Sequence, residues 1–130
     1  MNMIIRTDEL LQHPVMGTAP WSVLVFGGSE FTDRDGLTHV LDGVHEIITI
    51  GEIIHQRGDA VGILAGEWAL SIGIPELTFD QTCPLSAVHL AIAFPGDRET
   101  LTTIQAARTA FVPVLKVRQE GENMVLAFAK

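Results

Sequence analysis

The sequence predicts one α/β domain, a three-layer sandwich with a mainly parallel sheet and a C-terminal antiparallel edge strand. Short apolar runs alternate along the chain with segments of helical periodicity, roughly 11 to 16 residues each. Three of the apolar runs end in a glycine-containing turn directly before such a segment. The length of 130 residues suits one domain with one core.

The first strand and helix are predicted near the start of the domain. Residues 21–28 form a continuous apolar run, which is typical of a strand buried on both faces of a parallel sheet. Segment 33–48 follows, with Asp33 as N-cap or first-turn acid. Its apolar residues share one helix face: Leu37, Val40, Leu41 and Val44. A second strand is expected over 51–56.

A second helix is predicted over 58–75 and ends at Gly73 and Pro75. Its proposed apolar stripe consists of Ile63, Leu64, Trp68 and Ile72. A third strand is expected over 76–79 and a fourth over 90–94.

The C-terminal part supplies the last elements. The third helix is expected over 98–110, with Leu101, Ile104 and Ala107 facing inward. A fifth strand follows over 112–117. Residues 124–130 are predicted to form the antiparallel edge strand, after a hairpin turn at 120–123.

Residues 1–19 are interpreted as an N-terminal arm, and residues 20–130 as the domain. Segment 7–13 could form one or two helical turns with Thr7 as cap, before proline and glycine interrupt the chain. The arm either packs on the domain or meets a partner subunit. No signal peptide is expected at the N-terminus, which lacks a long apolar stretch.

Charge and composition limit the partners and the setting. Sixteen acidic against eight basic residues give a net charge of −8, which disfavours nucleic acid as a partner. The apolar runs are far shorter than the ~18 residues that span a bilayer, so no membrane partner is expected. Cys83 is the single cysteine, which fits a reducing, cytoplasmic setting, and we interpret it as a packed residue rather than a nucleophile.

The three glycine-containing turns predict where a ligand would bind. They begin near residues 27, 57 and 95, and each precedes a predicted helix. Carboxyl ends of parallel strands and helix N-termini together form anion sites. The alternative is that a strand-to-helix turn needs glycine for packing. One turn alone favours packing, whereas three together favour a site. Neither the dinucleotide fingerprint nor the P-loop motif is present.

The stretch VLVFGGSEFTDRDGLTHVLD (23–42) resembles the opening of the YspA-like (DUF2493) family of the SLOG superfamily, which also holds the "lonely guy" phosphoribohydrolases and the DprA proteins. The shared turn residues are Gly28, Ser29, Phe31 and Asp33. A Leu-Ala-x-x-Trp-Ala helix at 64–69, the AFPGDRET turn at 93–100 and the VPVLKV strand extend the resemblance over 21–117. It implies a Rossmann-like domain that binds a nucleotide or an ADP-ribose-like ligand.

The sequence departs from the family pattern at its turns. Asp97 and Glu99 stand where the family has glycines, and Gln56 and Arg57 stand where glycines are usual. Carboxylates there oppose a phosphate by charge and by size. Thr103 occupies the position of the glutamate that "lonely guy" enzymes use, so no general acid or base is expected.

The resemblance and the turns together give the candidate ligand-binding residues. Amides and the hydroxyl of the first turn would meet phosphate, Phe31 would pack on a base or ribose, and two arginines would offset the acids. His55, at a strand's carboxyl end, either reaches the ligand or packs in the turn. The full set is Gly27, Gly28, Ser29, Phe31, Asp33, His55, Arg57, Gly58, Pro95, Gly96, Arg98 and Thr100.

The first hypothesis is therefore a nucleotide or ADP-ribose-like ligand-binding module without catalysis. The second is a degenerate SLOG domain with a structural or protein-interaction role. A phosphoribohydrolase-like enzyme ranks third. No cofactor and no metal are expected, because His39 and His45 are six residues apart and do not share a helix face. A homo-oligomer is expected, since SLOG relatives pair through helices, and Trp68 or the arm could lie at the interface.

Overall fold

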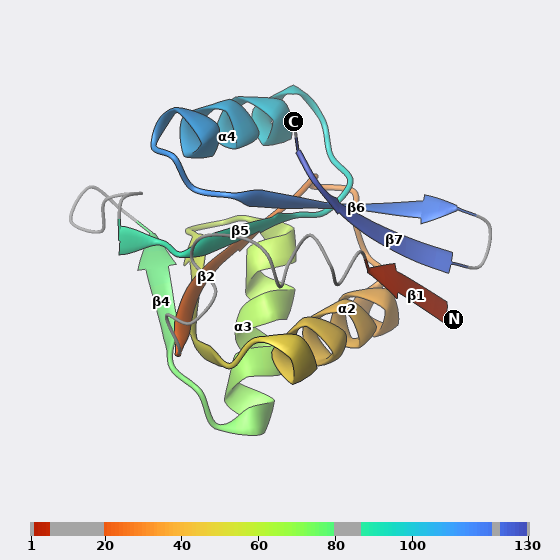
Figure 1. Cartoon of the computed structure of the whole chain (residues 1–130), viewed down its shortest axis with the longest axis vertical. Coiled ribbons are helices and arrows are strands. Elements are labelled where there is room, and N and C mark those ends of the chain that lie inside the picture. Colours follow the sequence, from red (N-terminus) through yellow and green to blue (C-terminus); the bar gives the residue numbers. More distant parts are fainter. Residues whose placement is uncertain (1, 6–19, 80–86, 121–122, 130) are drawn as a thin grey trace.

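The computed structural model describes residues 2–5, 20–79, 87–120 and 123–129, which fold around one sheet of seven strands (Figure 1). The strands are β1 (Asn2–Ile5), β2 (Trp21–Phe26), β3 (Ile50–Gln56), β4 (Glu76–Phe79), β5 (Leu90–Ala93), β6 (Val114–Glu120) and β7 (Asn123–Phe128). The helices are α2 (Arg34–Ile47), α3 (Ala60–Ile72) and α4 (Arg98–Thr109).

The sheet lies between two helical layers, with α2 and α3 on one face and α4 on the other (Figure 1). Side chains of β2 alternate between the layers. Val23 and Val25 belong to the core under α2 and α3. Leu24 and Phe26 belong to the core under α4. A strand buried on both faces explains the continuous apolar run, and the predicted three-layer α/β fold is confirmed.

The strand order is β1-β7-β6-β5-β2-β3-β4. All neighbouring pairs are parallel except β6 and β7, which form the predicted antiparallel pair. β1 pairs in parallel with β7 and extends the sheet beyond it, so the antiparallel C-terminal strand lies second from the edge and not at the edge as predicted. Strand β1 was not predicted from the sequence, because a four-residue run gives little periodicity and its pairing depends on a partner edge formed by the other end of the chain.

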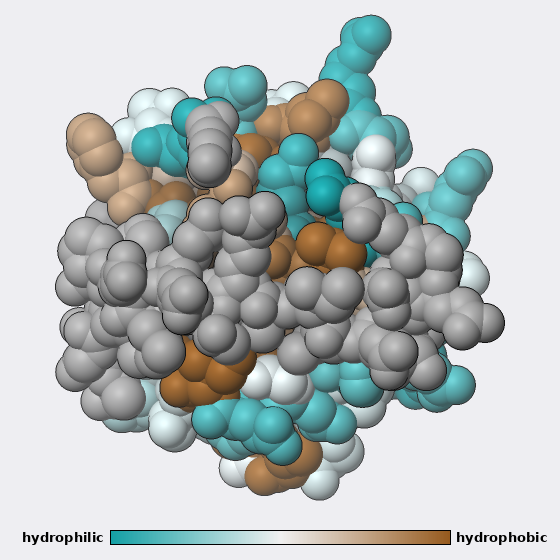
Figure 2. Space-filling model, turned by 45° about the vertical axis from the view of Figure 1, so that its right-hand side comes forward, coloured by the Kyte–Doolittle hydropathy of each residue, from teal (hydrophilic) through white to brown (hydrophobic). Residues whose placement is uncertain are grey.

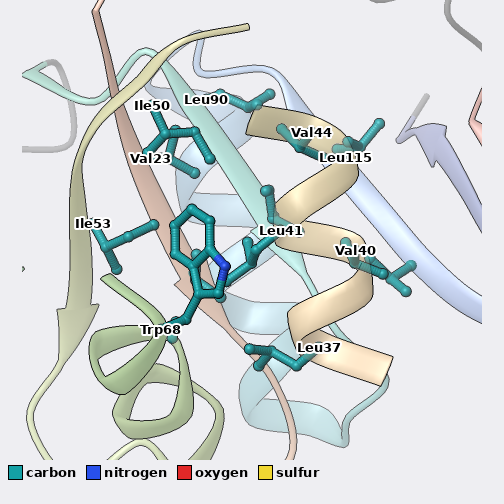
Figure 3. Packing of buried hydrophobic residues seen from close by; sticks show 14 of the residues in the cluster. Val23, Leu37, Val40, Leu41, Val44, Ile50, Ile53, Trp68, Leu90 and Leu115 are labelled. Carbon is teal, nitrogen blue, oxygen red and sulfur yellow. The ribbon is translucent and has the colours of Figure 1, made fainter. Parts of the chain in front are cut away.

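Helix α2 is amphipathic as predicted. The Asp33 carboxylate caps it by accepting a hydrogen bond from the Gly36 amide at 2.9 Å. Its four predicted apolar residues are all buried. Figure 3 shows them directed toward the sheet, with Trp68 pointing from α3 toward Leu41.

The predicted stripe of α3 was correct at Trp68, which is buried, and at Leu64, which packs against the core, but it was wrong at its other two residues. Ile63 is 48% exposed and Ile72 is 41% exposed. The helix instead buries mainly small residues, together with Trp68: Val61, Gly62, Ala65, Gly66, Trp68 and Ala69. Small residues let the helix approach β3 and β4 closely. Because apolar residues occur all around the helix, their periodicity does not indicate which face is buried. Gly73 ends α3 with φ of 80°, a left-handed conformation that suits glycine.

Helix α4 was predicted correctly at Ile104 and Ala107, which are buried. Leu101 was predicted to face inward, but it is 57% exposed. The first turn of α4 thus directs Thr100 rather than Leu101 toward the sheet, since Thr100 is buried.

Connections from β2 and β5 run to opposite sides of the sheet. β2 leads through α2 to β3, and β5 leads through α4 to β6, while β2 and β5 pair with each other. Ligands of open α/β sheets bind at such a switch point, outside the carboxyl ends of the strands. The topology therefore indicates that a ligand would bind at the turns after β2 and β5.

Several predictions fall outside the described residues: the helical turns at 7–13 with their Thr7 cap, the packing of Cys83, and the centre of the hairpin turn at 121–122. None of the described helices is both long and apolar enough to span a bilayer. Figure 2 shows brown hydrophobic atoms in several separate areas of the described surface, with teal hydrophilic atoms between them.

Candidate ligand-binding site

Two adjoining pockets lie at the carboxyl edge of the sheet. The first, here called the turn pocket, has a volume of about 170 Å³ and is walled by the turns after β2 and β3 and by the start of α4. The second, here called the Phe31 pocket, has a volume of about 480 Å³ and lies between the turns after β2 and β5. Ser29 and Asp97 line both pockets.

The turns after β2 and β5 touch each other at their glycines. The Gly28 amide donates a hydrogen bond to the Pro95 carbonyl at 3.0 Å. A Cβ on Gly28 would lie 2.6 Å from the Gly96 Cα, and one on Gly27 would lie 2.7 Å from a methyl of Val61. Close packing alone therefore requires these glycines. The Gly28 amide already donates to the Pro95 carbonyl, so it is not the free donor that an anion site would need.

Thr100 supplies a buried hydroxyl to the wall of the turn pocket. The residue is 6% exposed, and its Oγ1 is buried without a hydrogen-bond partner. It lies at the third position of α4, directly below the Gly96 turn, where any Cβ on Gly96 would overlap it. A buried hydroxyl without a partner is costly, so a hydrogen bond made to this atom would be stabilising.

Asp59 lies at the start of α3 and lines the same pocket. Its Oδ2 atom is buried without a hydrogen-bond partner. Burial raises the pKa of the Asp59 carboxyl above its ordinary value of 3.8. The backbone amides of Val61, Gly62 and Gly27 oppose this increase in pKa, as does His55, but they do not cancel it.

Asp97 and Glu99 bring two more carboxylates to the turn pocket. The Asp97 carboxylate accepts a hydrogen bond from the Glu99 amide at 3.1 Å and thereby caps α4. Arg57 is the cation among the described lining residues. The wall of the turn pocket thus carries three acids against one base, and both of its helix N-termini carry an aspartate.

The structure brings most of the proposed site residues to the two pockets. The turn pocket holds Gly27, Ser29, Arg57, Gly58 and Thr100. The Phe31 pocket holds Gly28, Ser29, Phe31, Pro95 and Gly96. Three proposed residues line neither: Asp33 caps α2, Arg98 is exposed as the first residue of α4, and His55 is buried against Glu76.

Other lining residues were not proposed as ligand contacts: Phe26, Glu30, Gln56, Asp59, Ala60, Asp97, Glu99 and Thr103. Asp59 could have been found from the sequence, because an aspartate directly before a helical segment at a strand's carboxyl end indicates an N-cap facing the site. Asp97 and Glu99 were interpreted only as obstacles to phosphate.

A metal is not supported by the ligand geometry of the described part of the chain. Within residues 2–5, 20–79, 87–120 and 123–129, no three histidine, cysteine or acidic side chains converge as a metal site.

Comparison of the chain with protein-family models, curated proteins and solved structures found no match. The resemblance to YspA-like proteins therefore stays a prediction.

Proposed function

We propose that this protein is a binding module for a nucleotide-like ligand, including nucleosides and ADP-ribose-like molecules, which it holds without turnover. One observation carries the proposal: the buried, unpartnered hydroxyl of Thr100 in a pocket where two strand-to-helix turns meet the start of α4. An unsatisfied buried hydroxyl costs about 1–3 kcal/mol, which a ligand hydrogen bond would recover.

The two pockets match the two parts of such a ligand in size and lining. The Phe31 pocket, at about 480 Å³, has the volume of a small-molecule site and offers an aromatic ring and Pro95 to a base. The turn pocket offers the hydroxyls of Ser29 and Thr100 to polar groups. Because Ser29 and Asp97 line both, one molecule can occupy both pockets.

Isothermal titration tests the proposal on the full chain, with adenosine, guanosine, cytidine, uridine, their 5′-monophosphates and ADP-ribose as ligands. The Thr100→Val variant keeps the shape of the side chain but removes its hydroxyl. We expect it to lower affinity roughly fivefold, the effect of one hydrogen bond. Its melting temperature should stay equal or rise, because a buried unpaired hydroxyl is lost.

Thr102→Val is the matched control, because Thr102 is exposed on α4 and lines neither pocket, and its hydroxyl donates to the Arg98 carbonyl within the helix. It should bind like the parent chain. Absence of heat with every ligand would overturn the proposal. Equal affinity of the Thr100→Val variant and the parent chain would remove the observation on which it rests.

A structural or protein-interaction role is the second candidate. It is favoured by the glycine contacts, because packing between the turns accounts for Gly28 and Gly96 without any ligand.

A phosphoribohydrolase-like activity has less support. Thr103 lines the turn pocket where a catalytic carboxylate would be needed, and its hydroxyl bonds the Glu99 carbonyl at 3.1 Å. Release of free base from a nucleoside monophosphate would restore that candidate.

The proposal includes self-association through the exposed face of α3. Trp68 was a candidate for this interface, but it is 5% exposed and packs in the core. Ile63 and Leu70 lie two turns apart on α3 and are exposed. A second copy of the chain would cover them, as exposed apolar groups favour. Light scattering after size exclusion should show a dimer that Leu70→Glu converts to monomer, and a monomeric parent chain at high concentration would contradict it. The cytoplasmic setting stays a prediction from the single cysteine.

A further inference from the structure

We propose that the turn pocket takes the hydroxyl-bearing sugar of an uncharged nucleoside and disfavours a phosphate group. This inference rests on the proposed function and specifies the ligand class of the same site. It follows from the charge of the pocket wall, from the atoms left unpaired there and from the size of the space.

The acids already hold the positions that a phosphate would use. Anions bind at helix N-termini, where amides lack partners. At α4 the Asp97 carboxylate accepts the Glu99 amide, and at α3 Asp59 occupies the N-cap. A phosphate at either helix N-terminus would therefore approach a carboxylate, and like charges in a partly buried site repel.

The same acids suit hydroxyl donors. Carboxylates accept hydrogen bonds from ribose hydroxyls in nucleotide-binding α/β domains. Asp59 presents a buried Oδ2 without a partner, and Thr100 a buried Oγ1 without a partner. Thr100 can donate and accept, whereas an ionised carboxylate only accepts. A vicinal diol both donates and accepts, so it carries the groups that these two atoms lack.

The space fits a single sugar ring. The turn pocket has about 170 Å³, and a cavity of about 150 Å³ holds a benzene ring. The adjoining Phe31 pocket then receives the base. The Phe31 ring packs against Phe94, with ring centres 5.1 Å apart, so it is held in place as one wall for the base.

Titration calorimetry of ribonucleosides against their 5′-monophosphates and 2′-deoxy forms tests the inference. For the best-bound base, we expect the ribonucleoside to bind about fivefold or more tightly than its monophosphate, the effect of one nearby like charge. The 2′-deoxy form should also bind more weakly, since a donor is lost. Inorganic phosphate should give no heat.

Glu99→Gln and Asp97→Asn remove the two charges while keeping size and, with asparagine, the cap. Each should raise the affinity for the monophosphate relative to that for the nucleoside. Asp35→Asn removes the same charge from the first turn of α2, outside both pockets, and should leave the ratio unchanged. This control separates a local effect from that of net charge.

The outcomes separate the inference from the proposed function. A monophosphate that binds more tightly than its nucleoside, or a ratio unmoved by both pocket variants, would overturn the inference alone. Absence of binding by every ligand would overturn both.

Discussion

The Nε2 atom of His55 lies 2.5 Å from Oε1 of Glu76, and the pair joins β3 to β4 underneath α3. His55 is buried, while the Glu76 side chain is 30% exposed. Two glycines of α3 pass over the pair. A Cβ on Gly62 would lie 2.5 Å from the His55 Cβ, and one on Gly66 would overlap the Glu76 carboxylate.

Gly66→Ala is expected to destabilise the protein, although alanine normally stabilises a helix by up to about 1 kcal/mol relative to glycine. The added methyl would displace the Glu76 carboxylate from His55. Glu76→Ala alone should also lower the free energy of unfolding, by roughly 1–3 kcal/mol, because buried His55 loses its partner. Urea denaturation of both single variants and of the double variant measures their coupling.

In the Glu76→Ala background the methyl meets no carboxylate. Gly66→Ala should then be neutral or stabilising. A loss of stability equal to that in the parent chain would show that the carboxylate does not set the requirement for glycine.

Trp68 ties α3 to α2. Its indole Nε1 donates to the Asp42 carboxylate at 2.8 Å, and the residue is 5% exposed. Figure 3 shows the Trp68 ring extending from α3 toward Leu41 of α2. Trp68→Ala should lower the free energy of unfolding by about 3–5 kcal/mol, through lost burial and a cavity. Asp42→Ala removes only the hydrogen bond and should cost about 1 kcal/mol, measured by chemical denaturation. If the two variants lost equal free energy of unfolding, the hydrogen bond and not the packing of Trp68 would account for its contribution to stability.

Asp59 should make stability depend on pH. The folded chain raises the pKa of Asp59 above 3.8, so the folded state holds this proton more tightly than the unfolded state. The free energy of unfolding therefore falls as pH rises from about 3.8 through the folded pKa, and the loss is absent below that window. Asp59→Asn removes this dependence.

Thermal melting from acid to neutral pH should show the Asp59→Asn variant gaining stability relative to the parent chain as pH increases. Asp35→Asn, which removes a charge from an exposed position, controls for net charge. A difference that shrinks with increasing pH would contradict a raised pKa of Asp59 in the folded state.

Phe111 follows α4 in a left-handed conformation, with φ of 61°, and is 94% exposed. Its amide bonds the Arg108 carbonyl at 3.0 Å, as at a helix C-terminus where glycine is preferred. Phe111→Gly should raise the free energy of unfolding by about 1 kcal/mol, because the strain of the left-handed conformation is lost. Phe111→Ala keeps a Cβ, and it should not stabilise.

Local periodicity was enough to establish the layers, the strand-helix alternation and the buried face of α2. Helix α2 separates apolar from polar residues clearly, so its spacing of Leu37, Val40, Leu41 and Val44 allows one orientation. The run 21–26 has apolar side chains on both faces, which requires a central strand. These features can be predicted from the sequence, because they depend only on the spacing of residues that lie close together along the chain.

The remaining features depend on contacts between distant parts of the chain. The face of α3 depends on the close approach permitted by Gly62 and Gly66, and β1 depends on the edge of β7. The turn pocket joins Asp59 to Thr100, forty-one positions apart, and leaves an oxygen of each without a partner. Which polar atoms remain unpaired depends on how distant turns pack together, and local periodicity contains no information about that.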